Sequence, residues 1–430
     1  MDNNVIVTYH GDVETTSFFM TQIEKELRAE GFDVRPLYYG AYSEEAAVEG
    51  AVFLTFNFAG LYSKDGCFVP AGSDGGIQLV DRYRMKCVNI IVDHPYHYHD
   101  FLQEQLQLRA DRYYQYCIDR VHIAYMERYF PKVRLSGFLP SGGVAYSDVE
   151  PAAAGDVKWQ DRPIDLLFAG TYVPPEGFEL FIGRNGPEYS AFYHSMLDEA
   201  LSDPDKRLEE IVRRRLIEEV EDEVSEDQIR ETLGHIQFLD YYVRYRRRGE
   251  VIRYLADWES SNGDGLHLTI VGSGWESLME ELVHPERVTL MPYADSRSIL
   301  QLLSQSRFSL NVLPSFHEGG HDRIFNSMLC GAVCVTDSNS YLDGILQGGK
   351  NAVLYDTPSV MDSADAGSRV EDGSLEELAA YLYRALTDRS LDEEMNRIRA
   401  HARETASFHT WKQRSLSLAG ALRDIMEAGS

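Results

Sequence analysis

The sequence contains no run of about 18 apolar residues, which is the length that a helix needs to cross a membrane. We therefore predict no membrane span. The first four residues carry no basic cluster, so no secretory signal peptide is expected. Cysteine is scarce, odd in number and scattered, at Cys67, Cys87, Cys117, Cys330 and Cys334. This pattern is typical of free thiols in a reducing compartment, so we predict a cytoplasmic location.

Positive charge is also in deficit. The 430 residues include 41 Lys and Arg against 69 Asp and Glu, which gives a formal net charge of −28. A field of that sign repels nucleic acid and anionic lipid and excludes general binding to either. An anionic ligand must therefore be held by a locally positive pocket. Hydrophobic content of 44% and charged content of 26% are ordinary for a globular protein and exclude global disorder.

Apolar strands alternate with helical segments through the first third of the chain. Phe19, Ile23 and Leu27, for example, recur at the spacing of one helix face. The alternation predicts crossover connections and a parallel sheet covered on both faces. The strands are expected near residues 5–9, 32–39, 51–58, 87–93, 113–119 and 134–140.

A second series of the same kind follows residues 147–163, which are rich in Pro, Ala and Asp and are predicted to form a linker. Its expected strands are 165–170, 266–272, 288–291, 308–313, 332–336 and 352–355, with terminal helices at 375–399 and 410–427. A helical insertion of about residues 176–258 carries an acidic run at 218–227 and basic clusters at 213–215 and 246–248. We interpret the charged segments as solvated helix faces; a surface that docks a partner is the alternative.

The densest group of chemically useful side chains lies in residues 315–332. Gly319–Gly320 lets the backbone approach a ligand closely, and a helix that begins there offers free N–H groups to an anion. Arg323 can bind phosphate oxygens with its planar guanidinium. A diphosphate fits this chemistry. The alternative is a helix capped by Asp322 or Glu318, with Arg323 in a surface ion pair.

The motif His321-Asp322-Arg323-x-Phe325, followed by Cys330-Gly331-Ala332-x-x-x-Thr336-Asp337, resembles the C-terminal signature of the CgeB-like (spore-maturation-protein-like) glycosyltransferases. These have the GT-B architecture of two tandem Rossmann-like domains facing an interdomain cleft. Residues 165–172, 268–275 and 410–414 resemble further segments of that family. The resemblance covers residues 160–430 outside the insertion and is weaker over the first 150. It implies an α/β fold with an acceptor-side domain (1–150), a nucleotide-sugar domain (160–408, insertion about 176–258) and a terminal helix (409–430) crossing back to the first domain.

The resemblance also implies a donor site. The wider family carries Glu-x7-Glu, and here Glu318 is followed at the second position by Asn326, so a ribose-side carboxylate has become an amide. An amide oxygen still accepts a hydroxyl proton, without charge assistance. Gly170 and Thr171 would border the donor phosphates, although a plain strand-ending turn is the alternative. Tyr293 would stack on the nucleobase, or be a surface tyrosine. The predicted nucleotide-sugar site comprises Gly170, Thr171, Tyr293, Gly319, Gly320, His321, Asp322 and Asn326.

Asp93 and His94 follow a buried strand of the first domain and are candidates for a general base. His10, Asp12 and Asp119 are rivals for that role. A strand-end turn with polar caps is the structural alternative. A metal site at residues 93–100 is disfavoured because the resembled enzymes need no catalytic metal. The predicted catalytic residues are Asp93, His94, Glu318 and Arg323.

Together these features predict a metal-independent glycosyltransferase without a cofactor. It would move a sugar from a nucleotide-diphosphate sugar, by resemblance UDP-linked, to a hydroxyl on a protein, glycan or small molecule. Arg323 and the helix start would stabilise the leaving diphosphate, and Glu318 would orient the sugar. Two alternatives stay open: a non-catalytic protein on a decayed fold, motivated by Asn326 and the insertion, and a nucleotide-sugar epimerase. Neither the stereochemical course nor the oligomeric state follows from the sequence.

Overall fold

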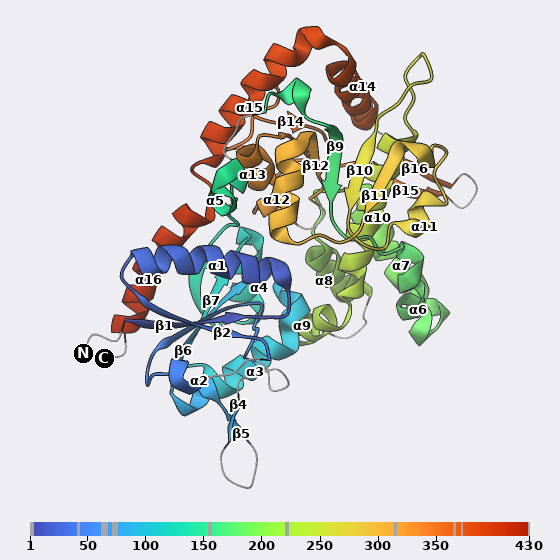
Figure 1. The fold of residues 1–430 in the computed structure, drawn as a ribbon. Helices are drawn as coiled ribbons and strands as arrows, with labels where there is room; N and C mark the ends of the chain where they lie inside the picture. Colours follow the sequence, from blue (N-terminus) through green and yellow to red (C-terminus); the bar gives the residue numbers. More distant parts are fainter. Residues whose placement is uncertain are drawn as a thin grey trace. The chain divides into compact units, whose positions relative to one another are not determined.

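The computed structural model describes residues 4–40, 44–61, 68–70, 76–153, 157–219, 223–313, 316–363, 367–370 and 373–428. Cys67 and Ser315 lie outside these ranges. The chain divides into two compact units (Figure 1). Unit 1 contains Met1–Gly142, Glu318–Gly320 and His409–Ser430, and unit 2 contains Gly143–His317 and His321–Phe408. Within the segment predicted as a linker, Trp159 is 1% exposed, so this part packs into unit 2 instead of connecting freely.

Unit 1 is built on a parallel sheet in the order β2-β1-β3-β6-β7-β8. All residues of β1 and β3 are buried, as expected of a sheet covered on both faces. The predicted strands are confirmed. Their bounds are β1 (Val5–His10), β2 (Asp33–Tyr38), β3 (Val52–Phe56), β6 (Lys86–Ile91), β7 (Tyr113–Cys117) and β8 (Arg134–Phe138); a hairpin of β4 (Phe68–Pro70) and β5 (Gly76–Gln78) was not expected.

The helices of unit 1 include one from each end of the chain. Trp411 of α16 packs against Phe19 of α1 and Phe56 of β3, with ring centroids 4.7 and 5.9 Å apart. Helices α1 and α16 thus cover the same face of the sheet (Figure 1). The bounds are α1 (Glu14–Ala29), α2 (Leu79–Arg82), α3 (His99–Arg109), α4 (Arg120–Tyr129) and α16 (Trp411–Glu427).

Unit 2 contains a second parallel sheet, in the order β11-β10-β9-β12-β13-β14. The order reverses between β9 and β12, as in dinucleotide-binding Rossmann sheets. The predicted α/β class with two parallel sheets is therefore confirmed. The strands are β9 (Ile164–Ala169), β10 (Leu268–Val271), β11 (Val288–Met291), β12 (Ser306–Asn311), β13 (Val333–Thr336) and β14 (Val353–Leu354), with a separate hairpin of β15 (Val360–Ser363) and β16 (Gly367–Val370).

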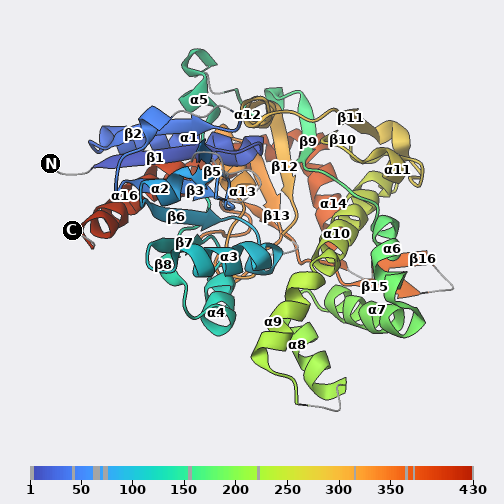
Figure 2. The ribbon, with the colours of Figure 1, turned by 90° about the horizontal axis from the view of Figure 1, so that it is seen from below.

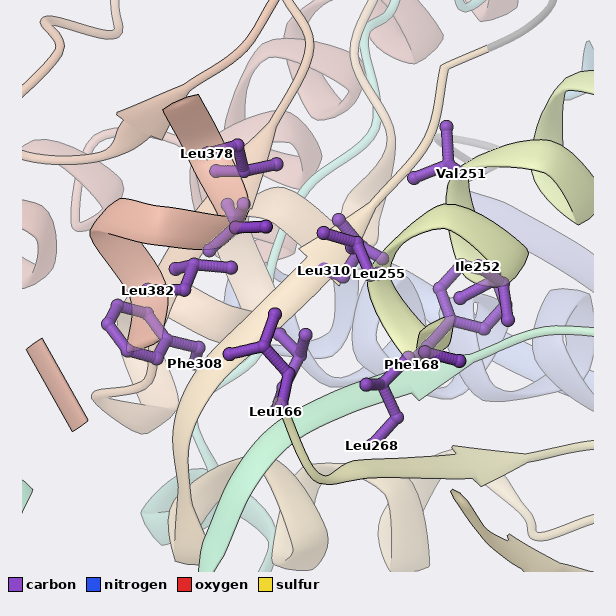
Figure 3. Packing of buried hydrophobic residues seen from close by; sticks show 14 of the residues in the cluster. Leu166, Phe168, Val251, Ile252, Leu255, Leu268, Phe308, Leu310, Leu378 and Leu382 are labelled. Carbon is purple, nitrogen blue, oxygen red and sulfur yellow. The ribbon is translucent and has the colours of Figure 1, made fainter. Parts of the chain in front are cut away.

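The core of unit 2 lies on one face of this sheet. Leu166, Phe308 and Leu310 pack there against Leu255 of α10 and Leu382 of α14 (Figure 3). Helix α13 packs in a second cluster with residues of β13 and α15. The helices are α5 (Tyr146–Val149), α10 (Phe238–Asp257), α11 (Glu276–Met279), α12 (Ser296–Gln305), α13 (Asp322–Cys330), α14 (Gly373–Thr387) and α15 (Asp392–Ala406).

One predicted feature of unit 2 is wrong and another is present. The single helix expected at 375–399 is wrong, because α14 ends at Thr387 and the side chain of Asp388 accepts a hydrogen bond from Ser390 N in the turn before α15. The helical insertion is present. It contains α6 (Glu179–Ile182), α7 (Pro187–Ser202), α8 (Leu208–Glu219), α9 (Glu226–His235) and α10, with α8 and α9 away from the sheet (Figure 2).

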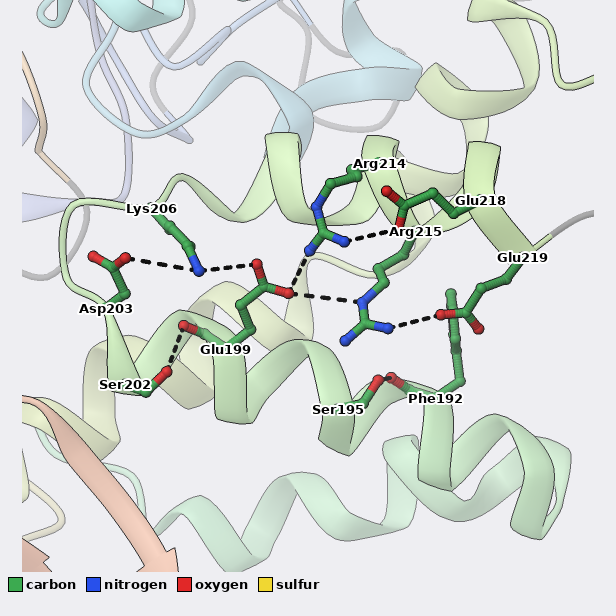
Figure 4. Close-up of polar contacts among 10 residues, drawn as sticks. All are labelled: Phe192, Ser195, Glu199, Ser202, Asp203, Lys206, Arg214, Arg215, Glu218 and Glu219. Carbon is green, nitrogen blue, oxygen red and sulfur yellow. Dashed lines mark hydrogen bonds and ion pairs between the residues drawn. The ribbon is translucent and has the colours of Figure 1, made fainter.

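The basic cluster at 213–215 lies on a solvated face, as predicted. Arg214 pairs with Glu199 and Glu218, and Arg215 pairs with Glu219 (Figure 4). Exposed pairs of this kind contribute little to stability. No helix in the described part of the chain is long and apolar enough to cross a membrane.

Candidate functional site

The carboxyl edge of the unit 2 sheet brings together residues from distant parts of the sequence. Ligands of open α/β sheets bind outside the carboxyl ends of the strands where the strand order reverses, which here is between β9 and β12. Gly170 and Thr171 directly follow β9, and the segment after β12 leads into α13. The guanidinium of Arg323, on α13, donates to the backbone carbonyl of Ala169 over 2.7 Å. Predicted site residues from both segments therefore meet at this edge.

Helix α13 begins at Asp322, two residues after Gly320 and close to the expected start. Gly319 forms a backbone bridge with Asp119 within unit 1. A Cβ atom at Gly319 would lie 2.6 Å from the carbonyl oxygen of Ile118, so the close approach visible here is to the protein's own backbone. The N–H of Glu318 donates to Asp119 over 3.1 Å. A role of the Glu318 side chain toward a sugar stays a prediction.

Arg323 is half-buried in the first turn of α13. Its Nη2 lies 2.9 Å from Nε2 of His321, the residue that precedes the helix. A Cβ atom at Gly170 would lie 3.1 Å from Nη1 of Arg323, so the glycine leaves room for the guanidinium. The role of Gly170 and Thr171 toward donor phosphates stays a prediction.

Helix α10 contributes a positive group that the sequence does not assign to the site. The prediction that residues 246–248 form a solvated face is wrong, because Arg247 and Arg248 are 3% and 6% exposed. Arg248 donates a hydrogen bond to the backbone carbonyl of Thr171, and its guanidinium lies 5.8 Å from the ring centroid of Phe168. The sequence offers no local signal for this difference, because residues 213–215 are also three consecutive arginines on a helix and lie on a solvated face.

Arg244, Arg248 and Arg323, which we call the arginine cluster, reinforce one another's positive potential. Burial lowers the pKa of Arg248 to about 9, and the charges of Arg323 and Arg244 add to the fall. Burial likewise lowers the pKa of Arg323, against the opposing charge of Asp322. Burial and the charge of Arg323 lower the pKa of His321 to about 4, so this imidazole is neutral at pH 7. A bound anion would reduce the repulsion among these arginines. A locally positive site of this kind is what a chain of negative net charge needs in order to bind an anionic ligand.

Asn326 makes two hydrogen bonds within unit 2. Its Nδ2 donates to Oδ2 of Asp322 over 2.9 Å, and its Oδ1 accepts from the N–H of Val144 over 2.8 Å. A carboxylate here could not donate to Asp322 and would repel it. An amide at position 326 therefore fits these two neighbours better than a carboxylate would. Contact with a ribose stays a prediction.

A buried carboxylate joins the loops that follow β12 and β13. Asp337 accepts hydrogen bonds from Leu313 N over 2.9 Å and from the Thr357 hydroxyl over 2.8 Å. Burial raises its pKa to about 6, although these hydrogen bonds and the charge of Arg247 oppose the rise. The carboxylate thereby holds the backbone at Leu313, in the loop that leads from β12 to α13, and the side chain of Thr357, which follows β14.

The loop after β9 packs on the loop after β10. Tyr172 stacks on Trp275 with ring centroids 4.8 Å apart. Gly274 has φ +85°, and a Cβ atom there would lie 2.0 Å from the Tyr172 carbonyl oxygen, so only glycine fits. Tyr293 follows β11 and is 63% exposed, and its predicted contact with a nucleobase is untested.

Asp93 and His94 lie in unit 1, directly after β6. Asp93 accepts hydrogen bonds from Asn57 over 3.3 Å and from the Tyr98 hydroxyl over 3.0 Å. His94 is buried, and its ring stacks on Tyr96 with centroids 3.7 Å apart. Their catalytic role stays a prediction. Across the residues that the structure describes, no three His, Cys, Asp or Glu side chains are grouped so that they could hold a metal ion.

Comparisons with known proteins show what this chain is similar to in sequence and in fold. Residues 246–420 match the family model described as glycosyl transferase-like, a range that includes Arg248 and Arg323. A search of curated proteins found no significant match. Among solved structures, sucrose-phosphate synthase from Thermosynechococcus elongatus is similar, with 12% identity, coverage of 99% of this chain and 100% of that chain, and a TM-score of 0.52.

Two further solved structures are similar to this chain. A glycosyltransferase from Rickettsia africae has 9% identity, coverage of 100% of both chains and a TM-score of 0.51. An alpha-glucosyltransferase in complex with UDP-glucose and DNA containing an abasic site has 10% identity, coverage of 97% and 98%, and a TM-score of 0.53.

The chain has the GT-B glycosyltransferase fold. At these identities the structural likeness establishes the fold, while the family match extends the glycosyltransferase likeness to the sequence of residues 246–420. Arg248 and Arg323 thus contact the backbone at the end of β9, at the strand-order reversal of the unit 2 sheet. The CgeB-like subgroup stays a prediction.

Proposed function

We propose that this protein transfers a glycosyl group from a nucleotide-diphosphate sugar to a hydroxyl group without a metal ion. The observation that carries the proposal is the arginine cluster, which concentrates positive charge at the strand-order reversal of unit 2 in a chain of net charge −28. Negative charge develops on the leaving diphosphate during transfer. Preorganised cations and helix N–H groups stabilise such charge, as a metal ion does in other enzymes.

Each predicted site residue has a distinct task in this proposal. Arg323 and Arg248 bind the phosphate oxygens, and the free N–H groups at the start of α13 add further donors. His321 stays neutral and contacts the Arg323 guanidinium, while Gly170 leaves it room. Glu318 orients the sugar, as the family resemblance implies.

We propose uridine as the nucleotide. A protein with the same fold was solved with UDP-glucose, which supports this choice. The acceptor is a hydroxyl on a protein, a glycan or a small molecule. We place the protein in the cytoplasm, a proposal supported by four free and buried cysteines among the residues described.

The test is incubation of purified protein with a panel of nucleotide sugars, with and without a cell extract as the acceptor source. Sugar transfer to a component of the extract supports the proposal. Release of an epimeric nucleotide sugar without any acceptor would identify an epimerase. Absence of turnover, together with normal cellular function of Arg323→Ala, would identify a non-catalytic protein.

Arg323→Ala should lower kcat/KM by about 10²-fold or more, comparable to the loss of one preorganised donor. Arg214→Ala is the matched control, because Arg214 forms only solvated pairs on the insertion. A value for Arg323→Ala within twofold of the control would contradict the assignment.

A further inference from the structure

The helical insertion carries exposed apolar side chains close together in the sequence. Leu180 and Phe181 of α6 are 84% and 48% exposed, and Tyr189 of α7 is 55% exposed. Helix α7 packs along α10, and α6 packs on α7 (Figure 2). Single exposed apolar residues are ordinary, whereas a contiguous group of them marks an interaction surface. The contacts that join these three side chains therefore decide their meaning.

Aromatic contacts connect them into one surface. The ring of Phe181 stacks on Phe238 at the start of α10 with centroids 6.1 Å apart, and Phe238 lies edge-on to Tyr193 with centroids 5.5 Å apart. Tyr193 lies one turn after Tyr189 on α7, so both tyrosines are on the same face of that helix. We call Leu180, Phe181 and Tyr189 the apolar patch. It exposes on the order of 300 Å², a size at which surface patches are often functional.

Acidic side chains accompany the apolar patch. Glu179 and Glu188 are exposed, and each directly precedes a residue of the patch. Residues 176–191 contain three glutamates and a single basic residue, Arg184. Glu179 pairs with His194 over 3.3 Å, but the side chains are 45% and 40% exposed, so this pair contributes little and can exchange for another cation. The patch thus complements a ligand that is apolar at its centre and positively charged at its margin.

We infer that the apolar patch binds a basic amphipathic helix of a partner protein. A second copy of this chain would bring acidic margins together, and the net charge of −28 repels anionic lipid, so neither matches the charge of the patch. Residues 175–202 form helices and turns, so the patch offers no sheet edge to which a partner could add a strand. An amphipathic helix presents an apolar stripe with lysine or arginine beside it. This function is additional to glycosyl transfer.

The probe is a fluorescein-labelled synthetic peptide in which leucine recurs at i, i+3 and i+4 and lysine fills the other positions. Fluorescence anisotropy with the full chain should show saturable binding of one peptide per chain, with a Kd in the micromolar range. A peptide with glutamate in place of every lysine tests the charge. A peptide of the same composition in scrambled order tests the apolar stripe. Each should bind at least about tenfold more weakly.

Leu180→Ser/Tyr189→Ser should weaken binding of the leucine–lysine peptide by about tenfold or more, because it removes two of the three apolar anchors. Glu179→Gln/Glu188→Gln should weaken it by about threefold and reduce its dependence on salt. Val283→Ser is the matched control, because Val283 is 72% exposed but follows α11, outside the insertion. All the substituted side chains are exposed, so the urea midpoint should not change. UDP-glucose hydrolysis should stay within about twofold of the wild type.

Equal binding by the wild-type protein and Leu180→Ser/Tyr189→Ser would show only a general attraction of a cationic peptide to an acidic chain and would overturn the inference. Absence of saturable binding would do the same. Association of the chain with itself, or with vesicles of zwitterionic lipid, that is lost in Leu180→Ser/Tyr189→Ser would assign the patch to another occupant and also overturn it. None of these results affects the proposed function, which UDP binding and sugar transfer test separately.

Discussion

Replacement of Arg248 by methionine should make the unliganded protein more stable and less active. Burial beside two other arginines lowers its pKa from the ordinary arginine value to about 9. At about 1.4 kcal/mol per pKa unit, this corresponds to roughly 5 kcal/mol against the charged form. Methionine keeps an apolar stem but removes the charge-assisted hydrogen bond to Thr171, worth about 1.5–3 kcal/mol. The free energy of unfolding should therefore rise by roughly 2–3 kcal/mol.

The sign of this effect is fixed across the neutral range. A base with a lowered native pKa destabilises the folded state fully at every pH below that pKa. The effect fades only as the pH rises above about 9 toward the ordinary pKa of arginine. The gain in Arg248→Met should thus be the same at pH 6 and pH 8. Activity should move the other way, with kcat lower by about 10²-fold, because one cation no longer faces the leaving diphosphate.

Urea unfolding with and without UDP, together with UDP release from UDP-glucose, measures both effects. UDP should stabilise the wild-type protein more than Arg248→Met. Arg214→Met serves as the control and should change stability by less than about 0.5 kcal/mol, since Arg214 forms exposed ion pairs. A less stable Arg248→Met variant with unchanged kcat would show that Arg248 only holds the loop after β9, and would refute its role toward an anion.

Three further substitutions test other contacts. Asn326→Asp places a second carboxylate beside Asp322 and should cost about 1–3 kcal/mol in urea unfolding at pH 7; an unchanged midpoint would contradict the contact. Burial raises the pKa of Asp337 to about 6 from 3.8, so wild-type stability should fall by roughly 2–3 kcal/mol from pH 4 to pH 7 relative to Asp337→Asn; parallel stability curves would refute this. Gly170→Ala must displace the Arg323 guanidinium, whose Nη1 would lie 3.1 Å from the new Cβ, so UDP affinity in calorimetry should fall about tenfold while stability changes by less than about 1 kcal/mol; equal affinity would count against that position of the guanidinium.

The sequence determined the two sheets, because a parallel strand covered by helices on both faces must be apolar along its whole length. Such runs stand out from their helical neighbours, and β3 (Val52–Phe56), which is buried along its whole length, lies within the predicted range 51–58. The end of α13 also has a local cause, since Gly331 adopts the left-handed conformation, with φ +76°, that often follows a helix. The likeness to glycosyltransferases also came from local motifs, around His321 and Arg323.

Only the tertiary structure decided how the site residues are used. The chain contains two runs of three arginines, at Arg213–Arg215 and Arg246–Arg248. The first run forms solvated ion pairs, whereas Arg248 of the second donates a hydrogen bond to the backbone at the carboxyl end of β9. Gly319 and Asn326 are similar cases, because their neighbours, Ile118 and Val144, are distant in the sequence. Hydrophobic periodicity depends on residues that are close together in the sequence, so it predicts individual helices and strands. The charge of a site and the space within it depend instead on which side chains, distant in the sequence, are brought together by packing.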